Sequence, residues 1–273
     1  MNTSLYALVT GSFAVVGLLW SVSRAIRGTA PSARQDARMV NILLSGVILL
    51  LGMLCGARLA YSLSHWVEFS PDPWMVFDVM AGGLSWMGLA LGGVIALLVY
   101  AGLTERSPVE LLGLHYPLIA VTCIGLWLGA QLAGLGYGPI VPAAWWALPV
   151  LDAAGDLAPR IPLPVIGSLL SLFVMMAIDR LGRQGIPPPS LTLIFCTFQF
   201  GILYVLTFFR ADPMLMAGGQ IIERWAALFH AGLSLTALLT VLILSHRRKV
   251  STPSGEPGIH DKSTRKNGVK LDL

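Results

Sequence analysis

Seven apolar stretches make up most of this chain, and most of them reach the roughly 20 residues that an α-helix needs to cross a bilayer. The stretches span residues 5–22, 39–63, 76–103, 111–135, 163–178, 191–209 and 225–244. The fifth is short, and we expect it to extend to Ile161 and Leu181. With 55% hydrophobic and only 12% charged residues, the chain has too little polar surface for a soluble globule. No stretch alternates as barrel strands do, so the sequence predicts an all-α, polytopic membrane protein with seven transmembrane helices.

The basic residues predict the orientation of this bundle. Fourteen of the 18 Lys and Arg residues follow the first, third, fifth and seventh stretches, which all end on the same side of the membrane. Because loops rich in Lys and Arg stay in the cytoplasm, we expect the N-terminus outside and the C-terminus in the cytoplasm. The first stretch lacks a basic segment before it, so we expect it to remain as a helix and not to be cleaved as a signal peptide.

The chain divides into a transmembrane domain, residues 1–245, and a tail, residues 246–273. The domain contains an outer segment, residues 136–162, and the tail is basic and poor in large apolar residues, so we expect it to be disordered. The sequence pI of about 9.1 reflects topology and contact with anionic lipid, and nothing indicates nucleic-acid binding. Cys55, Cys123 and Cys196 lack the spacing of a metal site and are predicted to lie in the core. We predict no metal and no cofactor.

Arg58 lies near the outer end of the second stretch, where a charge is costly unless it meets an anion. One candidate anion is a lipid phosphate, which a guanidinium binds through two hydrogen bonds. The alternatives are an ion pair with Asp78 that only orients helices, or a side chain that reaches up to the membrane surface. The sequence leaves these alternatives open.

Glycine-rich segments lie at the outer ends of the third and fourth stretches. Gly82 and Gly83 precede Ser85, which could donate a hydrogen bond to a lipid headgroup, although glycines at this spacing also let helices pack closely. Gly134 and Gly138 flank Tyr137 and indicate irregular backbone there.

Two further polar positions occur at or near the ends of the last helices. Arg210 and Asp212 follow the sixth stretch and are expected to form a surface ion pair of little energetic value. His230 in the seventh stretch could carry a proton, but a single membrane histidine is more often a hydrogen-bonded packing residue.

The order of these landmarks resembles that of the bacterial prolipoprotein diacylglyceryl transferases. The resemblance rests on segments that cover nearly the whole chain: Tyr6-Ala7, Gly56-Ala57-Arg58-Leu59-Ala60-Tyr61, Gly82-Gly83-Leu84-Ser85, Gly134 with Tyr137-Gly138, Arg160 with Pro162, and Phe208-Phe209-Arg210 with Asp212. It implies seven membrane helices with an external N-terminus in the bacterial plasma membrane. It also implies transfer of diacylglyceryl from phosphatidylglycerol to the lipobox cysteine of a preprolipoprotein, so phospholipid and preprolipoprotein are the expected partners.

The resemblance also suggests which residues form the site. Tyr6, Arg58 and Arg210 are the expected catalytic residues, with Tyr6 near the thiol and the two arginines on the phosphate. The expected substrate-binding residues, which surround the headgroup, are Tyr61, Gly82, Gly83, Ser85, Gly134, Tyr137, Gly138 and Arg160.

The chain departs from the family pattern at several polar positions. The family has His where this chain has Met87. Further positions that carry Arg, Asn, His or Glu in the family correspond to Trp127, Ala130, Leu135, Ile161, Gly167, Leu203 and Thr207. The first hypothesis is a diacylglyceryl transferase with a degenerate active site. The alternatives are a non-catalytic phospholipid- or lipoprotein-binding protein of the same fold and a small-solute transporter lined by Arg58 and Asp78.

Overall fold

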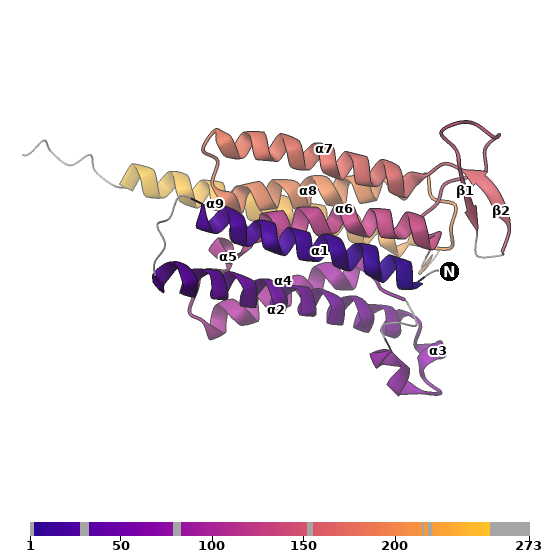
Figure 1. The fold of residues 1–273 in the computed structure, drawn as a ribbon, viewed down its shortest axis with the longest axis horizontal. Helices are drawn as coiled ribbons and strands as arrows, with labels where there is room; N and C mark the ends of the chain where they lie inside the picture. Colours follow the sequence, from indigo (N-terminus) through magenta and orange to yellow (C-terminus); the bar gives the residue numbers. More distant parts are fainter. Residues whose placement is uncertain are drawn as a thin grey trace, which may run out of the picture.

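The computed structural model describes residues 3–27, 33–78, 83–151, 155–214, 216–217 and 220–251. Within these ranges the chain forms a bundle of long helices (Figure 1). The long helices are α1 (Thr3–Ile26), α2 (Ala33–Ser64), α4 (Trp86–Leu103), α6 (Tyr116–Ala133), α7 (Leu163–Arg183), α8 (Pro188–Leu206) and α9 (Ile222–Ser251). The shorter ones are α3 (Trp66–Phe69), the 3-10 helix η1 (Pro73–Phe77) and α5 (Pro108–Leu114).

The seven long helices are each long and apolar enough to cross a membrane. Large apolar side chains on the outside of the bundle, such as Leu19, Phe173 and Ile243, are more than half exposed. Such an exterior suits a hydrocarbon solvent, in which helices satisfy their own backbone hydrogen bonds. The protein is therefore a multi-pass membrane protein, which confirms the predicted fold class. Cys55 is exposed on this exterior, so its predicted place in the core was wrong.

The third predicted span began too early. Residues 73–77 form η1, and α4 begins only at Trp86. Gly83 has a φ of +76°, which a helix cannot accommodate, and the Ser85 Oγ accepts a hydrogen bond from the Gly88 N–H as the helix cap. The helix of this span therefore begins at Trp86 and not at Val76.

The fourth predicted span is interrupted at its beginning. α5 ends at Leu114, His115 adopts a non-helical conformation, and α6 starts at Tyr116 with Pro117 in its first turn. Proline has no N–H and clashes with the preceding turn, so it fits only at a helix start.

The fifth predicted span corresponds to α7. This helix reaches Leu181, as expected, and continues to Arg183, whereas Ile161 lies before the helix.

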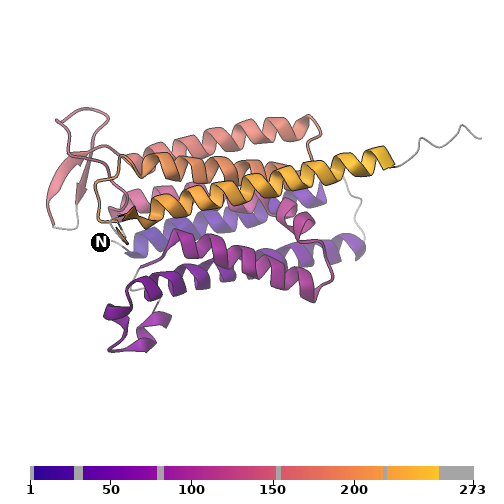
Figure 2. The ribbon, with the colours of Figure 1, turned by 180° about the vertical axis from the view of Figure 1, so that it is seen from behind.

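Helices α2 and α4 pack backbone against backbone. A Cβ placed on Gly56 would lie 2.7 Å from the Gly92 Cα, and one on Gly88 would lie 2.8 Å from the Gly56 carbonyl carbon. Gly52 extends the same contact. Small residues four apart allow membrane helices to approach this closely. The two helices form one side of the bundle in Figures 1 and 2.

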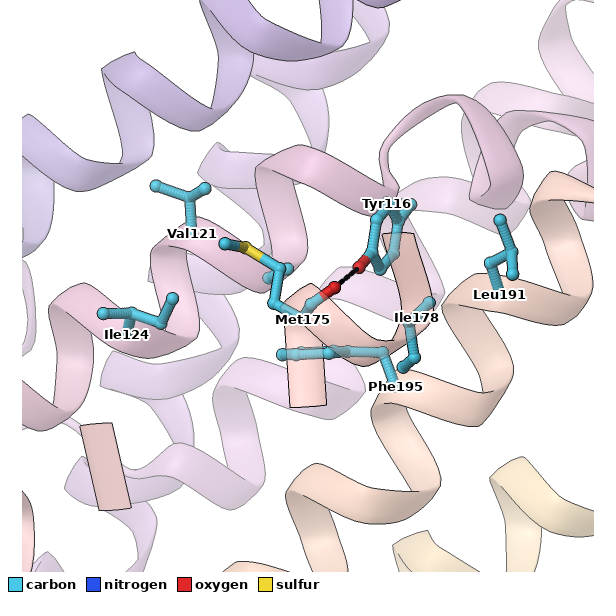
Figure 3. Packing of buried hydrophobic residues seen from close by; sticks show 8 residues of the cluster. Tyr116, Val121, Ile124, Met175, Ile178, Leu191 and Phe195 are labelled. Atoms are coloured by element: carbon cyan, nitrogen blue, oxygen red, sulfur yellow. Dashed lines mark hydrogen bonds between the residues drawn. The ribbon is translucent and has the colours of Figure 1, made fainter. Parts of the chain in front are cut away.

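The most buried apolar cluster lies where α6, α7 and α8 meet (Figure 3). Phe195 and Tyr116 pack edge to face with ring centroids 6.1 Å apart, and Ile178 and Leu191 close the cluster. The Tyr116 hydroxyl donates to the Met175 carbonyl at 3.1 Å, so the one polar group of this ring is satisfied.

One end of the bundle carries the N-terminus, α3 and a β-hairpin, and we call it the hairpin end (Figure 1). The antiparallel strands are β1 (Leu148–Leu151) and β2 (Leu157–Arg160), with Leu148 opposite Arg160. Strands β3 (Met216–Ala217) and β4 (Gln220–Ile221) form a second, smaller pair before α9. α9 ends at Ser251, and residues 252–273, most of the predicted tail, lie outside the described residues.

Candidate functional site

Arg58 projects from α2 into the segment that leads to α4. Its Nε donates to the Val76 carbonyl at 2.9 Å, Nη1 to the Gly83 carbonyl at 3.2 Å, and Nη2 to the Met75 carbonyl at 2.5 Å. The guanidinium carbon also lies 5.0 Å from the centroid of the Phe69 ring. Arg58 is only 4% exposed. The side chain thus fastens η1 and the residues before α4 to α2, and its contact with a lipid phosphate stays a prediction.

Tyr61, Gly83 and Ser85 lie in the same group as Arg58. A side chain on Gly83 would overlap the Tyr61 ring, and the Ser85 N–H donates to the Ala57 carbonyl at 3.0 Å. Tyr61 itself stacks on His65 with ring centroids 4.1 Å apart. Gly82, the fifth residue predicted for this part of the site, lies outside the described residues.

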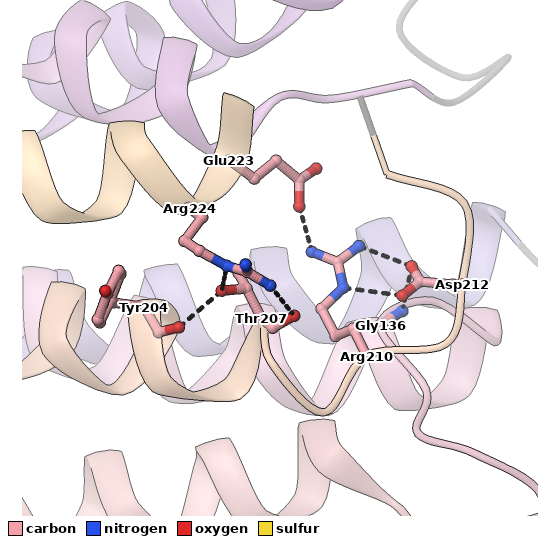
Figure 4. A network of polar contacts seen from close by, with 7 residues as sticks. All are labelled: Gly136, Tyr204, Thr207, Arg210, Asp212, Glu223 and Arg224. Carbon is pink, nitrogen blue, oxygen red and sulfur yellow. Dashed lines mark hydrogen bonds and ion pairs between the residues drawn. The ribbon is translucent and has the colours of Figure 1, made fainter. Parts of the chain in front are cut away.

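Arg210 lies in the loop after α8 and is held by two carboxylates (Figure 4). Its Nε and Nη2 donate to the two oxygens of Asp212 at 2.8 and 2.6 Å, and Nη1 donates to Glu223. Asp212 Oδ2 also accepts the Gly136 N–H at 3.0 Å, which ties the loop to the outer segment. Arg210 and Asp212 do form the predicted ion pair. Its predicted place on the surface was wrong, because the Asp212 side chain is only 7% exposed and Glu223 also binds Arg210.

The electrostatics of this network favour a permanently charged Arg210. Burial opposes the charge, but hydrogen bonds and charges from Asp212 and Glu223 outweigh it, so the pKa of Arg210 lies above its ordinary value. The guanidinium already has two carboxylates as counter-charges. Positive charge at this point is consequently neutralised within the protein.

Arg160 and Tyr137 lie beside each other in the outer segment. The Arg160 guanidinium carbon is 4.5 Å from the centroid of the Tyr137 ring, and both residues are buried. The Ala211 N–H donates to the Tyr137 carbonyl at 2.9 Å, so this pair adjoins the Arg210 loop. Gly138 donates its N–H to Ile161 at 3.0 Å.

Gly134 and Tyr6 lie at the hairpin end of α6. Gly134 ends this helix with a φ of +68°, and a Cβ there would come 2.9 Å from the Leu151 carbonyl oxygen, so glycine is required by both conformation and space. Tyr6, near the start of α1, packs against Gly129, where a Cβ would lie 2.9 Å from the Tyr6 Cδ2. The structure thus brings the predicted residues to one end of the bundle in three groups, around Arg58, Arg210 and Tyr6.

Arg224, the third residue of α9, was not among the predicted site residues. Its guanidinium carbon lies 3.8 Å from the centroid of the Phe208 ring, and its Nη2 and Nε are 3.4 and 3.5 Å from the carbonyl and hydroxyl oxygens of Thr207 (Figure 4). These hydrogen bonds are at the long limit. Among the described residues, no carboxylate forms an ion pair with Arg224. Its charge is therefore less neutralised than that of Arg210.

His230, predicted to be a packing residue or a proton carrier, forms a second group with Trp86, which was not among the predicted residues. His230 in α9 is 7% exposed, and its ring centroid lies 5.9 Å from that of Trp86 and 5.0 Å from that of Phe200. The His230 Nδ1 is 2.7 Å from the Ala226 carbonyl oxygen. The His230 Nε2 and the Trp86 Nε1 are buried, and neither has a hydrogen-bond partner among the described residues. Helix α9 could be predicted, but not which nitrogen of this histidine is bonded.

Two of the positions that depart from the family pattern contact each other. A Cβ on Gly167 would lie 2.6 Å from the Trp127 ring, so the indole fills the space that a side chain at 167 would need. A bulky apolar ring and a glycine therefore replace two charged residues together. Thr207, at a third such position, is the residue that contacts Arg224.

An apolar groove runs along α8 beside α7. It has a volume of about 330 Å³ and is lined by Leu170, Thr197, Phe198, Gly201, Ile202, Val205 and Leu206. Residues 197–206 cover roughly 14 Å of helix at 1.5 Å per residue, about half of a 30 Å hydrocarbon core. The groove ends at Leu206, and neither Thr207 nor Arg224 lines it.

This arrangement defines a multi-pass membrane protein with Arg58, Arg210 and Arg224 at one end of its bundle. A family model described as prolipoprotein diacylglyceryl transferase matches residues 1–245. The chain belongs to this family, as the resemblance in its sequence indicated.

Relatives named phosphatidylglycerol--prolipoprotein diacylglyceryl transferase support the assignment to the family. The protein of Mannheimia succiniciproducens is 27% identical over 250 residues, which cover 88% of each chain. That of Oleidesulfovibrio alaskensis is 28% identical over 223 residues, 80% of this chain and 79% of the relative. That of Caldanaerobacter subterraneus is 33% identical over 144 residues, 50% of this chain and 52% of the relative.

Proposed function

We propose that this protein transfers diacylglyceryl from phosphatidylglycerol to the lipobox cysteine of a prolipoprotein. Membership of the family and the names of the relatives support this activity. In the reaction the thiol loses its proton, its sulfur bonds to the glycerol carbon of the diacylglyceryl group, and the carbon–oxygen bond to phosphate breaks. Glycerol phosphate leaves with that electron pair. The protein must therefore bind a phosphodiester and stabilise the charge on the leaving phosphate.

The observation that carries this proposal is the position of Arg224. Its guanidinium stands just beyond the end of α8, with weak contacts to Thr207 and no carboxylate within ion-pair distance among the described residues. A guanidinium at this end of the bundle is suited to bind the phosphate of a phospholipid through two hydrogen bonds. We propose that Arg224 binds the phosphate, while Arg210 fixes the start of α9 through Glu223.

The other predicted residues receive positioning roles in this proposal. Arg58 holds the segment between η1 and α4, and Tyr61, Gly83 and Ser85 complete that support. Tyr137 and Arg160 brace the Arg210 loop from the outer segment. In the same proposal Gly134 and Gly138 shape the turn after α6. Tyr6 is assigned the position near the thiol that the resemblance implies.

We also propose that the hairpin end faces outward from a bacterial plasma membrane, with the C-terminus in the cytoplasm. The positive charges support this orientation, because Arg24, Arg106 and Arg183 adjoin loops at the opposite end of the bundle. Alkaline phosphatase fused after Arg160 should be active, and the same enzyme fused after Arg183 should be inactive. Reversed activities would contradict the orientation.

A second function is favoured by one observation, the loss of ionisable groups at the family positions. Met87, Trp127, Leu135, Gly167 and Leu203 have no ionisable side chain that could carry a proton or a charge. A protein with these residues could bind phosphatidylglycerol or lipoprotein without turnover. The two functions differ in transfer, not in lipid binding.

The experiment is complementation of a strain that lacks its own diacylglyceryl transferase, combined with phosphatidylglycerol binding by the purified protein. Wild type should complement and bind the lipid. Arg224→Gln should do neither at the wild-type level, while Arg106→Gln, at an exposed position in the opposite loop, should match wild type. Binding without complementation would support the non-catalytic function, and full binding by Arg224→Gln would overturn the phosphate site.

A further inference from the structure

His230 presents an unpaired nitrogen lone pair inside the bundle. The carbonyl oxygen of Ala226, 2.7 Å from Nδ1, can only accept a hydrogen bond, so in the neutral ring Nδ1 carries the proton. Nε2 is then an acceptor, and it has no partner among the described residues although it is buried. A buried acceptor without a partner is rare in proteins and calls for a functional explanation.

The surroundings of this nitrogen suit a proton acceptor. Phe200, Phe229 and Trp86 pack around the imidazole with centroid distances of 5.0, 5.6 and 5.9 Å. The bond to Ala226 fixes the tautomer and the direction of the ring, as a carbonyl or carboxylate does for other catalytic histidines. Trp86 and Phe200 are only partly buried, so the group borders on accessible space.

His230 lies deeper in the bundle than the proposed phosphate site at Arg224. Phe200 and Thr207 are seven residues apart and share one face of α8, so Phe200 lies about 10 Å deeper than Thr207. Arg224 contacts Thr207 and His230 contacts Phe200. A phospholipid with its phosphate at Arg224 extends its diacylglyceryl group into the membrane, toward the depth of His230.

The carboxylates near this position are engaged elsewhere. Asp212 and Glu223 both bind Arg210.

We propose, on the basis of the transferase function proposed above, that the His230 Nε2 accepts the proton of the lipobox cysteine thiol. The sulfur then forms its bond to the glycerol carbon, and the carbon–oxygen bond to phosphate breaks. The imidazolium, still bonded to Ala226 through Nδ1, gives its proton to the departing glycerol phosphate. No other reactant is consumed. The unpartnered Trp86 N–H donates a hydrogen bond to a phosphate oxygen and positions this group.

The first test measures transfer from labelled phosphatidylglycerol to a lipobox peptide by full-length protein in nanodiscs. His230→Phe keeps a flat ring and should lower kcat by about 10²- to 10⁴-fold, as loss of a general base does, with little change in phosphatidylglycerol binding. Trp86→Phe should have a smaller effect, and Leu233→Ala, at an exposed position of α9, should have none. In His230→Ala, added imidazole should restore part of the rate. Wild-type turnover by His230→Phe would overturn the assignment, whereas an inactive wild type would overturn the transferase function.

A second test requires no turnover. In wild-type protein with ¹⁵N-labelled histidine, a lipobox peptide with serine in place of cysteine should shift the Nε2 resonance of His230, because the hydroxyl donates to this nitrogen. The matching alanine peptide, which has no donor, should leave the resonance unchanged. His230→Phe identifies the signal. Equal responses to the two peptides would refute contact between this nitrogen and the substrate side chain.

Discussion

Asp212→Ala tests whether the Arg210 network holds the start of α9 in place. The substitution removes two charge-assisted hydrogen bonds to Arg210 and the acceptor of the Gly136 N–H. The side chains of Arg210 and Asp212 are 16% and 7% exposed, so solvent screens the interaction only weakly. Breaking a buried ion pair costs about 3–5 kcal/mol when one charge is left alone.

Glu223 remains beside Arg210 in this variant, so the expected loss lies at the lower end, about 3 kcal/mol. Asp212→Asn keeps an acceptor oxygen for Gly136 and should lose about half as much, on the order of 1–2 kcal/mol. The measurement is the free energy of unfolding in mixed micelles by denaturing-detergent titration. Asp36→Ala, at an exposed carboxylate of α2, is the control.

A double variant separates the pair from its surroundings. Arg210→Met together with Asp212→Ala removes both partners of this pair and leaves Glu223 as it stands in Arg210→Met alone, so the double variant should be less destabilised than the sum of the two single variants by at least about 1 kcal/mol. The reasoning is refuted if Asp212→Ala unfolds within about 0.5 kcal/mol of wild type, or if the two substitutions are additive.

Three further substitutions test the packing around the site. Gly56→Ala should force α2 and α4 apart and lower stability by about 1–3 kcal/mol, whereas Gly102→Ala, where an added Cβ meets nothing within 4 Å, should not; equal stabilities would contradict the close contact. Trp127→Ala should leave a void beside Gly167 and cost about 3–5 kcal/mol, measured by the same titration, and a small loss would mean that neighbouring helices close the gap. Arg58→Gln should make the segment before α4 cleavable by protease in nanodiscs, and unchanged cleavage would argue against its role as a fastener.

The fold was largely predictable because hydropathy reports directly on membrane spans. All seven helices follow the seven apolar stretches. The predicted helix boundaries were wrong where glycine or a helix cap sets the end of a helix inside an apolar stretch. The apolar residues after Val76 looked helical, but Gly83 and the Ser85 cap delay α4 to Trp86. The outer hairpin of β1 and β2 was missed, since this proline-rich segment carries no regular strand pattern.

The sequence predicted which end of the bundle carries the charged residues, but not which groups bind each of them. Arg58 and Arg210 stood out as charges near the membrane, yet composition does not reveal that carbonyls bind one and carboxylates the other. Glu223 is thirteen residues from Arg210 and meets it only because α8 and α9 pack together. Arg224 looked like an ordinary loop residue. The unpaired nitrogen of His230 depends on side-chain geometry, which no periodicity encodes.

The most direct measurement of the central claim is the mass of a lipobox peptide after incubation with the purified protein and phosphatidylglycerol. The proposed transferase should yield a peptide whose cysteine carries diacylglyceryl through a thioether, with one glycerol phosphate released for each peptide modified. An unmodified peptide, recovered while phosphatidylglycerol remains bound to the protein, would contradict it.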